Sequence, residues 1–398
     1  MSIRDWRPDI ADFQRDTVLA YASHILEHRL MPTGRISYFP KHTYLGNGEI
    51  RSVESGQTHD LAVKRSVVNA AQIIKPMTGS HIPCFSCTAA VAVIHPRDLT
   101  SHHPLQDREY DAYCILGAGR TATDTTLHML SRGIPPDQIR WVKTRERWVL
   151  TTPQKQASPV TFDDRVAMSL ESLRLMSRVQ TPQEFCLELE RLGFLDRTSS
   201  DLEPHGFSPQ VITPTDAARL RTIQRVVRKG HVHAISELGM VLDEGAAPMP
   251  SRTLYIDCTG STGEIRKPPP IFRDNVIHLA ETHLCQPSFS AAMIGATERL
   301  DLSNAEKNAL CAPLHGTDIV TLFLTNILNQ HAWFHHDALR KWMEACRLDG
   351  FLQSAACTIN SDRPLPRSLQ VIRTVLPRAI INLELLLEQS GATDPLLD

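Results

Sequence analysis

The sequence predicts an α/β protein of two or three domains, organised around a dinucleotide-binding βαβ unit. The chain has 398 residues, and single hydrophobic cores rarely grow beyond roughly 250–300 residues. An apolar run at 112–116 is typical of a buried parallel strand. It is followed at once by a glycine-rich turn and then by residues 120–131, which have the pattern of a helix.

The glycine-rich turn matches the Gly-x-Gly-x-x-Gly/Ala pattern of dinucleotide-binding sites. In that pattern Gly117 permits the tight turn, Gly119 lets a pyrophosphate approach the backbone, and Ala122 lets the helix pack on the strand. The expected phosphate-binding loop also contains Ala118, Arg120 and Thr121. The start of the following helix would direct its unpaired N–H groups at the phosphates.

The residues after the loop fit the same unit. Gly133 is placed to end the helix, Pro135 and Pro136 prevent its continuation, and residues 139–142 form the returning strand. A glycine-rich strand-to-helix turn in another kind of α/β protein is the alternative, since the motif alone is weak evidence.

The residues that follow the second strand favour NADP over NAD. NAD sites place a carboxylate here for the ribose 2′-hydroxyl, whereas NADP sites place cations for the 2′-phosphate. Lys143 or Arg145 would attract that phosphate, and an arginine can bind it with two hydrogen bonds. Glu146 keeps NAD open as the alternative.

The remaining elements are expected on both sides of this unit. A helix is predicted at 9–30, and strands are predicted at 36–39, 49–53, 62–68, 254–257 and 275–279. Further helices are predicted at 163–197, 216–227, 290–298, 319–328, 339–346 and 377–389. Turns at 46–48 and 55–56 separate the early strands.

Composition excludes several classes of function. The net charge is −2, without the basic excess that nucleic-acid or anionic-membrane partners require. No apolar stretch approaches the roughly 18–20 residues that span a bilayer, and the N-terminus does not resemble a secretory signal. Nine cysteines without regular spacing indicate reduced thiols. We therefore expect a cytoplasmic protein with a small-molecule substrate and neither a nucleic-acid nor a membrane partner.

Three further groups of residues are candidates for a site. Cys84 and Cys87 form a Cys-x-x-Cys, the form of a redox disulfide or of half a metal site, but two ordinary thiols are the simpler interpretation, because the motif does not begin a helix that would activate them. The histidines at 102–103, 231 and 233, and 335–336 lack the spacing of a zinc site, so surface positions are the simpler interpretation. Asp257 and Cys258 would end a strand beside the cofactor, where structural roles are expected.

The sequence resembles the two-dinucleotide-domain flavoproteins related to flavin-containing monooxygenases, in a branch described as NAD(P)/FAD-dependent oxidoreductases. The resemblance is carried by residues 34–40, 44–48, 117–125, 139–142, Arg145, Trp148, 255–259, 286–292 and 306–308. It implies a Rossmann-type NADP domain inserted in a FAD-binding-like domain, with hydride passing from NADPH to the flavin and on to oxygen or an organic substrate. It also implies that segment 257–260, with Thr259 and Gly260 beside the cofactor, returns the chain from the NADP domain to the FAD domain.

The resemblance divides the chain at residues 108 and 260. Residues 1–108 would be a remnant of the FAD-binding-like domain, 109–260 the NADP domain with a helical insertion, and 261–398 a FAD-domain-like, mostly helical region. The FAD domain of relatives begins with its own Gly-x-Gly-x-x-Gly, and this chain has no glycine before Gly34. We therefore expect an incomplete FAD domain, and the alternative function is a non-catalytic or degenerate NADP-binding protein that has lost FAD binding.

Overall fold

The computed structural model is a mixed α/β protein with several sheets, one of which is parallel and five-stranded. It describes residues 15–71, 83–99, 110–151, 162–199, 201–204, 206–259, 268–316, 318–346 and 367–390. The chain divides into two units, Met1–Ser66 and Val67–Asp398, which are described separately here. Within the described residues no helix is both long and apolar enough to cross a membrane.

The first unit combines a helical segment with a small antiparallel sheet. Its elements are α1 (Arg15–Ile25), η1 (Leu26–Leu30), η2 (Met31–Thr33), β1 (His42–Gly46), β2 (Glu49–Ser52) and β3 (Thr58–Asp60). The turn expected at 46–48 joins β1 to β2, and Asn47 adopts the left-handed conformation that such turns require (φ 51°). The prediction of a strand at 36–39 was wrong: the segment is irregular, because β-prone residues form a strand only where another strand pairs with them.

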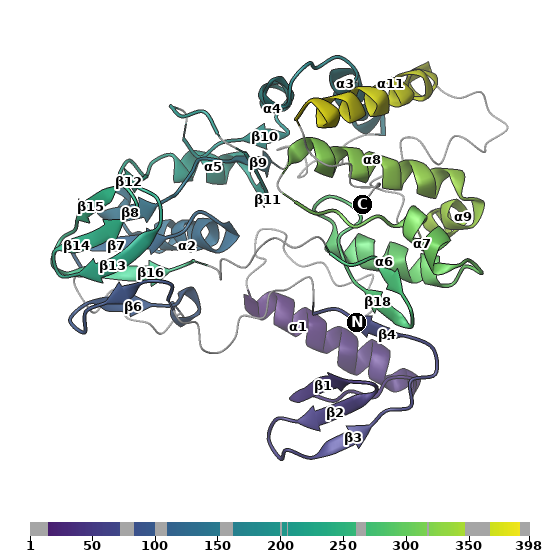
Figure 1. The fold of residues 1–398 in the computed structure, drawn as a ribbon, viewed down its shortest axis with the longest axis horizontal. Helices are drawn as coiled ribbons and strands as arrows, with labels where there is room; N and C mark the ends of the chain where they lie inside the picture. The colour runs from purple at the N-terminus through teal and green to yellow at the C-terminus, as the bar shows by residue number, and fades with distance from the viewer. Residues whose placement is uncertain are drawn as a thin grey trace. The chain divides into compact units, whose positions relative to one another are not determined.

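The five-stranded sheet forms the centre of one part of the second unit (Figure 1). Its order is β12 (Val226–Val227), β8 (Ile139–Val142), β7 (Ala112–Leu116), β16 (Thr253–Asp257) and β6 (Ala92–Ile94), with every neighbouring pair parallel. All five residues of β7 and of β16 are buried. Both faces of these strands must therefore be covered, as is usual for parallel sheets.

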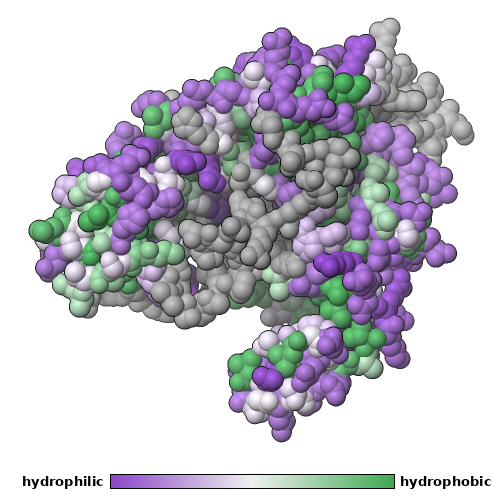
Figure 2. Space-filling model, in the orientation of Figure 1, coloured by the Kyte–Doolittle hydropathy of each residue, from purple (hydrophilic) through white to green (hydrophobic). Residues whose placement is uncertain are grey.

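Helices cover one face of this sheet and a β-meander covers the other. Tyr113 and Ile115 pack in a core with residues of α2 (Arg120–Ser131) and α5 (Pro214–Leu220). Cys114 and Leu116, which alternate with them, pack against β13 (Val232–Ser236), β14 (Gly239–Leu242) and β15 (Gly245–Pro248). The meander exposes Leu238 (86%) and Val241 (51%), and Figure 2 shows hydrophobic patches over these strands.

The predicted boundaries of the βαβ unit are confirmed. α2 spans 120–131 and β8 spans 139–142 as expected, and Gly133 ends the helix with a positive φ of 82°. By contrast, the helix predicted at 216–227 ends at Leu220, and its last residues form β12 at the edge of the sheet. Local periodicity did not reveal this short strand, which β8 stabilises by pairing with it.

A second layer takes its core from distant parts of the sequence. The elements are β9 (Trp148–Thr151), β10 (Leu195–Asp196), β11 (Phe207–Ile212), α3 (Phe162–Met176), α4 (Pro182–Arg191), α8 (Ile319–His335) and α11 (Arg367–Ser390). One cluster joins Trp148 and Phe185 to Leu322 and Leu383. The Asn382 amide donates to the carbonyls of Met176 and Val179 at 2.9 and 2.7 Å, which ties the C-terminal helix to the end of α3.

The remaining elements are a small sheet and three helices. They are β4 (Val67–Asn69), β17 (Phe272–Arg273), β18 (Val276–His278), α6 (Pro287–Glu298), α7 (Asn304–Leu310) and α9 (Asp337–Cys346).

The strand predicted at 62–68 was wrong for most of its length, since pairing with β18 begins only at Val67. The four predicted C-terminal helices are confirmed with longer bounds. β5 (Ser86–Cys87) pairs with β13, and β6 lies upstream of the predicted boundary at 108. The division into three domains stays a prediction.

Candidate functional site

Gly117 is required by the fold itself. Its φ is +112°, a conformation that side chains other than glycine rarely adopt. A Cβ at this position would lie 3.1 Å from the carbonyl oxygen of Cys258. The Gly117 N–H donates to the Val142 carbonyl at 3.0 Å, and its own carbonyl accepts from Trp141 Nε1 at 2.8 Å. Hydrogen bonds to β8 therefore fix the turn, which also packs against the residue that follows β16.

Gly119 is different, because nothing in the described part of the chain requires a glycine there. Its φ and ψ are −83° and −175°, which any residue adopts, and a Cβ would meet no atom within 4 Å. The residue is exposed. A glycine that neither backbone strain nor packing explains is the feature expected where a ligand approaches the main chain closely.

The start of α2 presents an uncapped helix end beside this glycine. Gly119 is the N-cap residue and provides no side-chain hydrogen bond to the first turn. Ala122 is fully buried against the sheet, as the motif requires. Arg120 and Thr121 are exposed, and the Arg120 guanidinium donates to Asp124 at 2.7 Å and to the Val211 carbonyl at 3.0 Å. Backbone N–H groups without partners and the positive end of the helix dipole favour an anion at this point.

The end of β16 forms the other wall of the turn. The Asp257 carboxylate is buried and accepts from the backbone N–H of Thr259 at 2.9 Å and from its hydroxyl. The Cys258 thiol lies 3.6 Å from the Thr125 hydroxyl, and burial raises its pKa to about 12. Cys258 is therefore an un-ionised thiol at neutral pH. Gly260, the last residue expected at the cofactor, lies outside the described residues.

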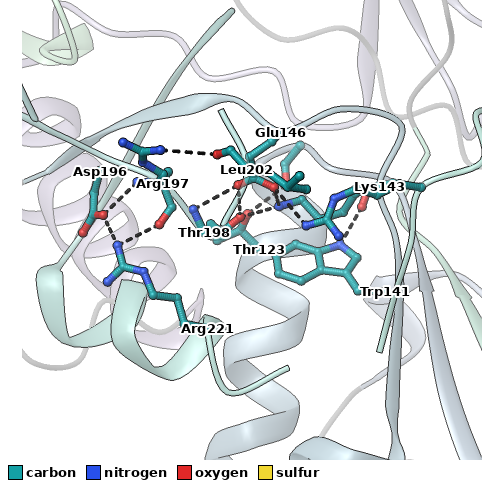
Figure 3. A network of polar contacts seen from close by, with 12 residues as sticks. Thr123, Trp141, Lys143, Glu146, Asp196, Arg197, Thr198, Leu202 and Arg221 are labelled. Atoms are coloured by element: carbon teal, nitrogen blue, oxygen red, sulfur yellow. Dashed lines mark hydrogen bonds and ion pairs between the residues drawn. The ribbon is translucent and has the colours of Figure 1, made fainter. Parts of the chain in front are cut away.

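A buried polar network follows β8 (Figure 3). Lys143 Nζ lies 2.8 Å from Glu146 Oε2 and also donates to the Thr198 hydroxyl. The other Glu146 oxygen accepts from the Thr198 N–H at 3.0 Å and from its hydroxyl at 2.6 Å. Arg228 Nη2 lies 3.4 Å from the same carboxylate, at the end of β12. Lys143 Nζ also lies 4.7 Å from the centre of the Trp141 ring.

The ionisation of this network follows from its contacts. Burial raises the pKa of Glu146, but the Lys143 charge and hydrogen bond, the Thr198 hydroxyl and Arg228 outweigh it, so the pKa is lowered. Burial also lowers the pKa of Lys143, against the raising effect of Glu146. Glu146 is therefore ionised at neutral pH and neutralised from several sides. Its side chain is only 2% exposed, so it does not present a carboxylate at the surface.

A small hollow beside the glycine loop is lined by Ala118, Trp141, Arg145 and Arg147, together with Gln210. Both arginines are exposed, and neither has an ion-pair partner within the described part of the chain. The Lys143 ammonium faces inward to Glu146, so among the described residues these two guanidinium groups are the exposed, unpaired cations of the segment between β8 and β9. The sequence motif identified Arg145 but missed Arg147, although it stands only two residues further.

Other residues of the site could not be found from local sequence. Thr198 and Gln210 come from the segment around β10 and β11, more than 50 residues beyond the loop they contact. Arg228 follows a strand that was predicted as helix. Only the topology, which places the carboxyl ends of β7, β8 and β12 along one edge, brings these residues together.

The other sequence motifs lie elsewhere. Cys87 is in β5 beside β13 and does not begin a helix, and both thiols of the Cys-x-x-Cys are exposed. His231 and His233 contact the Asp243 carboxylate at 2.9 and 2.5 Å. The described residues contain no group of three or more metal-ligating side chains that could hold an ion. Histidines 102 and 103 lie outside the described residues.

Comparison with known proteins gives distant relatives. No protein-family model matches the sequence. The chain is 29% identical over 339 residues to uncharacterized proteins of Mycobacterium tuberculosis and Mycobacterium bovis, in alignments that cover 83% of this chain. The matched region is 62% of the length of those relatives. The chain is thus similar to part of longer mycobacterial proteins, which are themselves described as uncharacterized.

Proposed function

We propose that this chain binds NADPH at the Gly117–Ala122 loop and belongs to an oxidoreductase of the flavin-monooxygenase-like kind. The observation that carries the proposal is Gly119. It is an exposed glycine with ordinary backbone angles and empty space where its side chain would be. The fold does not need it, and close approach of a pyrophosphate does.

The topology around the loop supports a Rossmann-type NADP domain. From β7 the chain proceeds through α2 to β8 and outward to β12, and then returns to β16 on the other side of β7. Ligands of open α/β sheets bind beyond the carboxyl ends of the strands, where the strand order reverses. Gly117 and Cys258 follow the two strands at that reversal and pack on one another.

The charges favour NADP over NAD. Glu146 was the residue that kept NAD open, and its carboxylate is turned inward to Lys143 and Thr198. Arg145 stays the proposed ligand of the 2′-phosphate, and its exposed neighbour Arg147 joins it in the same hollow. The Lys143 ammonium would contribute through its charge, since its hydrogen bonds go to Glu146 and Thr198.

The flavin part of the proposal rests on the sequence resemblance, in which the NADP domain is inserted in a FAD-binding-like domain. A bound flavin would accept hydride from the nicotinamide and react with oxygen or an organic substrate. We assign no residue of the chain to the flavin. The role derived for this chain's own residues is to bind and orient the dinucleotide through the turn, the start of α2 and the arginine-lined hollow.

Replacement of Gly119 tests the proposal. Gly119→Ala should weaken NADPH binding at least about tenfold, because a methyl group would occupy the path of the pyrophosphate. A tenfold loss of affinity corresponds to about 1.4 kcal/mol of binding free energy. The melting temperature should stay within a degree or two. Gly295→Ala, at an exposed glycine of α6 whose Cβ also meets no atom, is the matched control. Equal NADPH affinity in wild type and Gly119→Ala would refute the assignment.

The absorption spectrum separates the two functional hypotheses. Protein mixed with FAD and desalted should keep a flavin spectrum that NADPH bleaches under anaerobic conditions. A protein that binds NADPH but never retains flavin would instead favour a non-catalytic NADP-binding protein.

A further inference from the structure

A cavity of about 400 Å³ lies at the amino-terminal edge of the five-stranded sheet. Its wall includes Ala92 and Thr253, the first residues of β6 and β16, and Glu237 from the turn between β13 and β14. The glycine loop follows β7 at the opposite, carboxyl-terminal edge of the same sheet, so the cavity is a separate site. Its volume falls within the range of small-molecule pockets, which is roughly 300–1,000 Å³.

The charged residues in the wall of this cavity include a carboxylate that no cation of the described residues neutralises. The Arg252 guanidinium makes two hydrogen bonds to Asp111, at 2.7 and 3.3 Å, and this hydrogen bonding lowers the pKa of Asp111. The positive charge at the wall is therefore already compensated. Glu237 is exposed at the rim, and no cation of the described residues pairs with it. An anionic ligand would meet repulsion here, whereas a cation would find a counter-ion.

The inner wall carries the Tyr255 hydroxyl. Tyr255 is only 2% exposed and lines the cavity, and its phenol oxygen makes no hydrogen bond to another described residue. The oxygen is not one of the buried side-chain atoms that lack a partner, so it is open to the cavity and a ligand can reach it. Burial raises the pKa of Tyr255, so the phenol stays neutral and its oxygen can accept a hydrogen bond.

We propose that this cavity binds a small organic ammonium ion with an apolar or aromatic body. The ammonium N–H groups would donate to the Glu237 carboxylate and the Tyr255 phenol oxygen. The body would pack on Ala92 and on the ring of Tyr110, which both line the cavity. The proposal does not depend on the oxidoreductase reaction, because none of these residues belongs to the glycine loop.

Fluorine NMR of protein labelled with 3-fluorotyrosine tests the proposal at the site itself. The chain has six tyrosines, so the spectrum is simple, and the resonance missing in Tyr255→Phe identifies Tyr255. The probes are 2-phenylethylamine, benzylamine and tryptamine, each protonated at neutral pH, with 2-phenylethanol as the neutral counterpart. At least one amine should give a saturable shift of the Tyr255 resonance. The alcohol should bind about tenfold more weakly than 2-phenylethylamine, because it lacks the charge-assisted hydrogen bond.

Two charge-neutralising variants decide the outcome. Glu237→Gln should abolish the preference for amine over alcohol. Glu244→Gln, an exposed glutamate in the neighbouring turn of the same meander, should keep it. A melting temperature unchanged from wild type shows that each variant is folded. No saturable shift with any of the three amines at millimolar concentration, or an amine preference that survives in Glu237→Gln, would overturn the proposal.

Discussion

The buried pair of Lys143 and Glu146 allows a quantitative prediction. Glu146→Gln removes the negative charge while keeping nearly the same shape, and it leaves the Lys143 ammonium with its side chain only 6% exposed. The contacts that lose their negative partner are the ion pair at 2.8 Å and the charge-assisted bond from the Thr198 N–H at 3.0 Å, since a glutamine oxygen still accepts hydrogen bonds but carries no charge. Removing one partner of a buried ion pair costs about 3–5 kcal/mol, so we expect about 4 kcal/mol of lost stability.

The assay is urea denaturation of wild type and variant, followed by hydrogen exchange at residues 142–147. Exchange provides the local readout, because a chain with several cores can unfold in more than one step. Asp124→Asn is the control: Asp124 pairs with Arg120 at 2.7 Å, but the two side chains are 53% and 58% exposed. Such a surface pair contributes only about 0.3–0.5 kcal/mol. A loss below about 1 kcal/mol in Glu146→Gln, near the value for exposed pairs, would refute the reasoning.

The same residue predicts how stability depends on pH. The folded-state pKa of Glu146 is lowered from its ordinary 4.5. Its contribution is therefore fully present above pH 4.5 and is lost as the pH falls through the folded-state pKa. Wild type should lose stability below pH 4.5 more steeply than Glu146→Gln, which has no carboxyl to protonate. Parallel acid limbs in the two proteins would contradict the assigned ionisation.

Three further predictions follow from the site. Gly117→Ala should destabilise the fold by about 2–4 kcal/mol, because strain at φ +112° adds to the contact with the Cys258 carbonyl; a thermal melt unchanged from wild type would argue against this. Arg145→Ala combined with Arg147→Ala should reduce the NADPH-over-NADH affinity ratio at least about tenfold, measured by fluorescence titration, whereas an unchanged ratio would place the 2′-phosphate elsewhere. Cys258, whose pKa is raised to about 12, should resist iodoacetamide in the native state while the exposed Cys87 reacts, with mass spectrometry of digested protein as the readout.

The βαβ unit could be predicted almost to the residue because its determinants are local. A buried parallel strand needs a continuous apolar run, the turn needs Gly117, and the helix needs a stop signal at Gly133. These requirements act within about 30 residues of one another. Local preferences and tertiary contacts favour the same structure there, so α2 and β8 have the expected bounds.

Elements whose stability comes from partners were missed or misplaced. β12 is two residues long and exists because β8 pairs with it. The segment 36–39 has strand-forming residues but no strand beside it, and it is irregular. β9 and β11 are stabilised by each other and by a core shared with the C-terminal helices. The backbone of a strand forms its hydrogen bonds with another segment, and the strand's own residues do not identify that segment.

The sequence by itself determined the turn and the helix start at which we propose that a dinucleotide phosphate binds, because glycine conformations and helix starts are properties of adjacent residues. Only the tertiary structure decided which charges surround that turn. From the sequence, both Lys143 and Glu146 would be expected at the surface, because they are charged residues that follow a strand. The fold turns them toward Thr198 and Arg228, far along the chain, and leaves Arg145 and Arg147 exposed. Burial and pairing set the effective charge of a side chain, and both depend on segments that only the folded chain brings together.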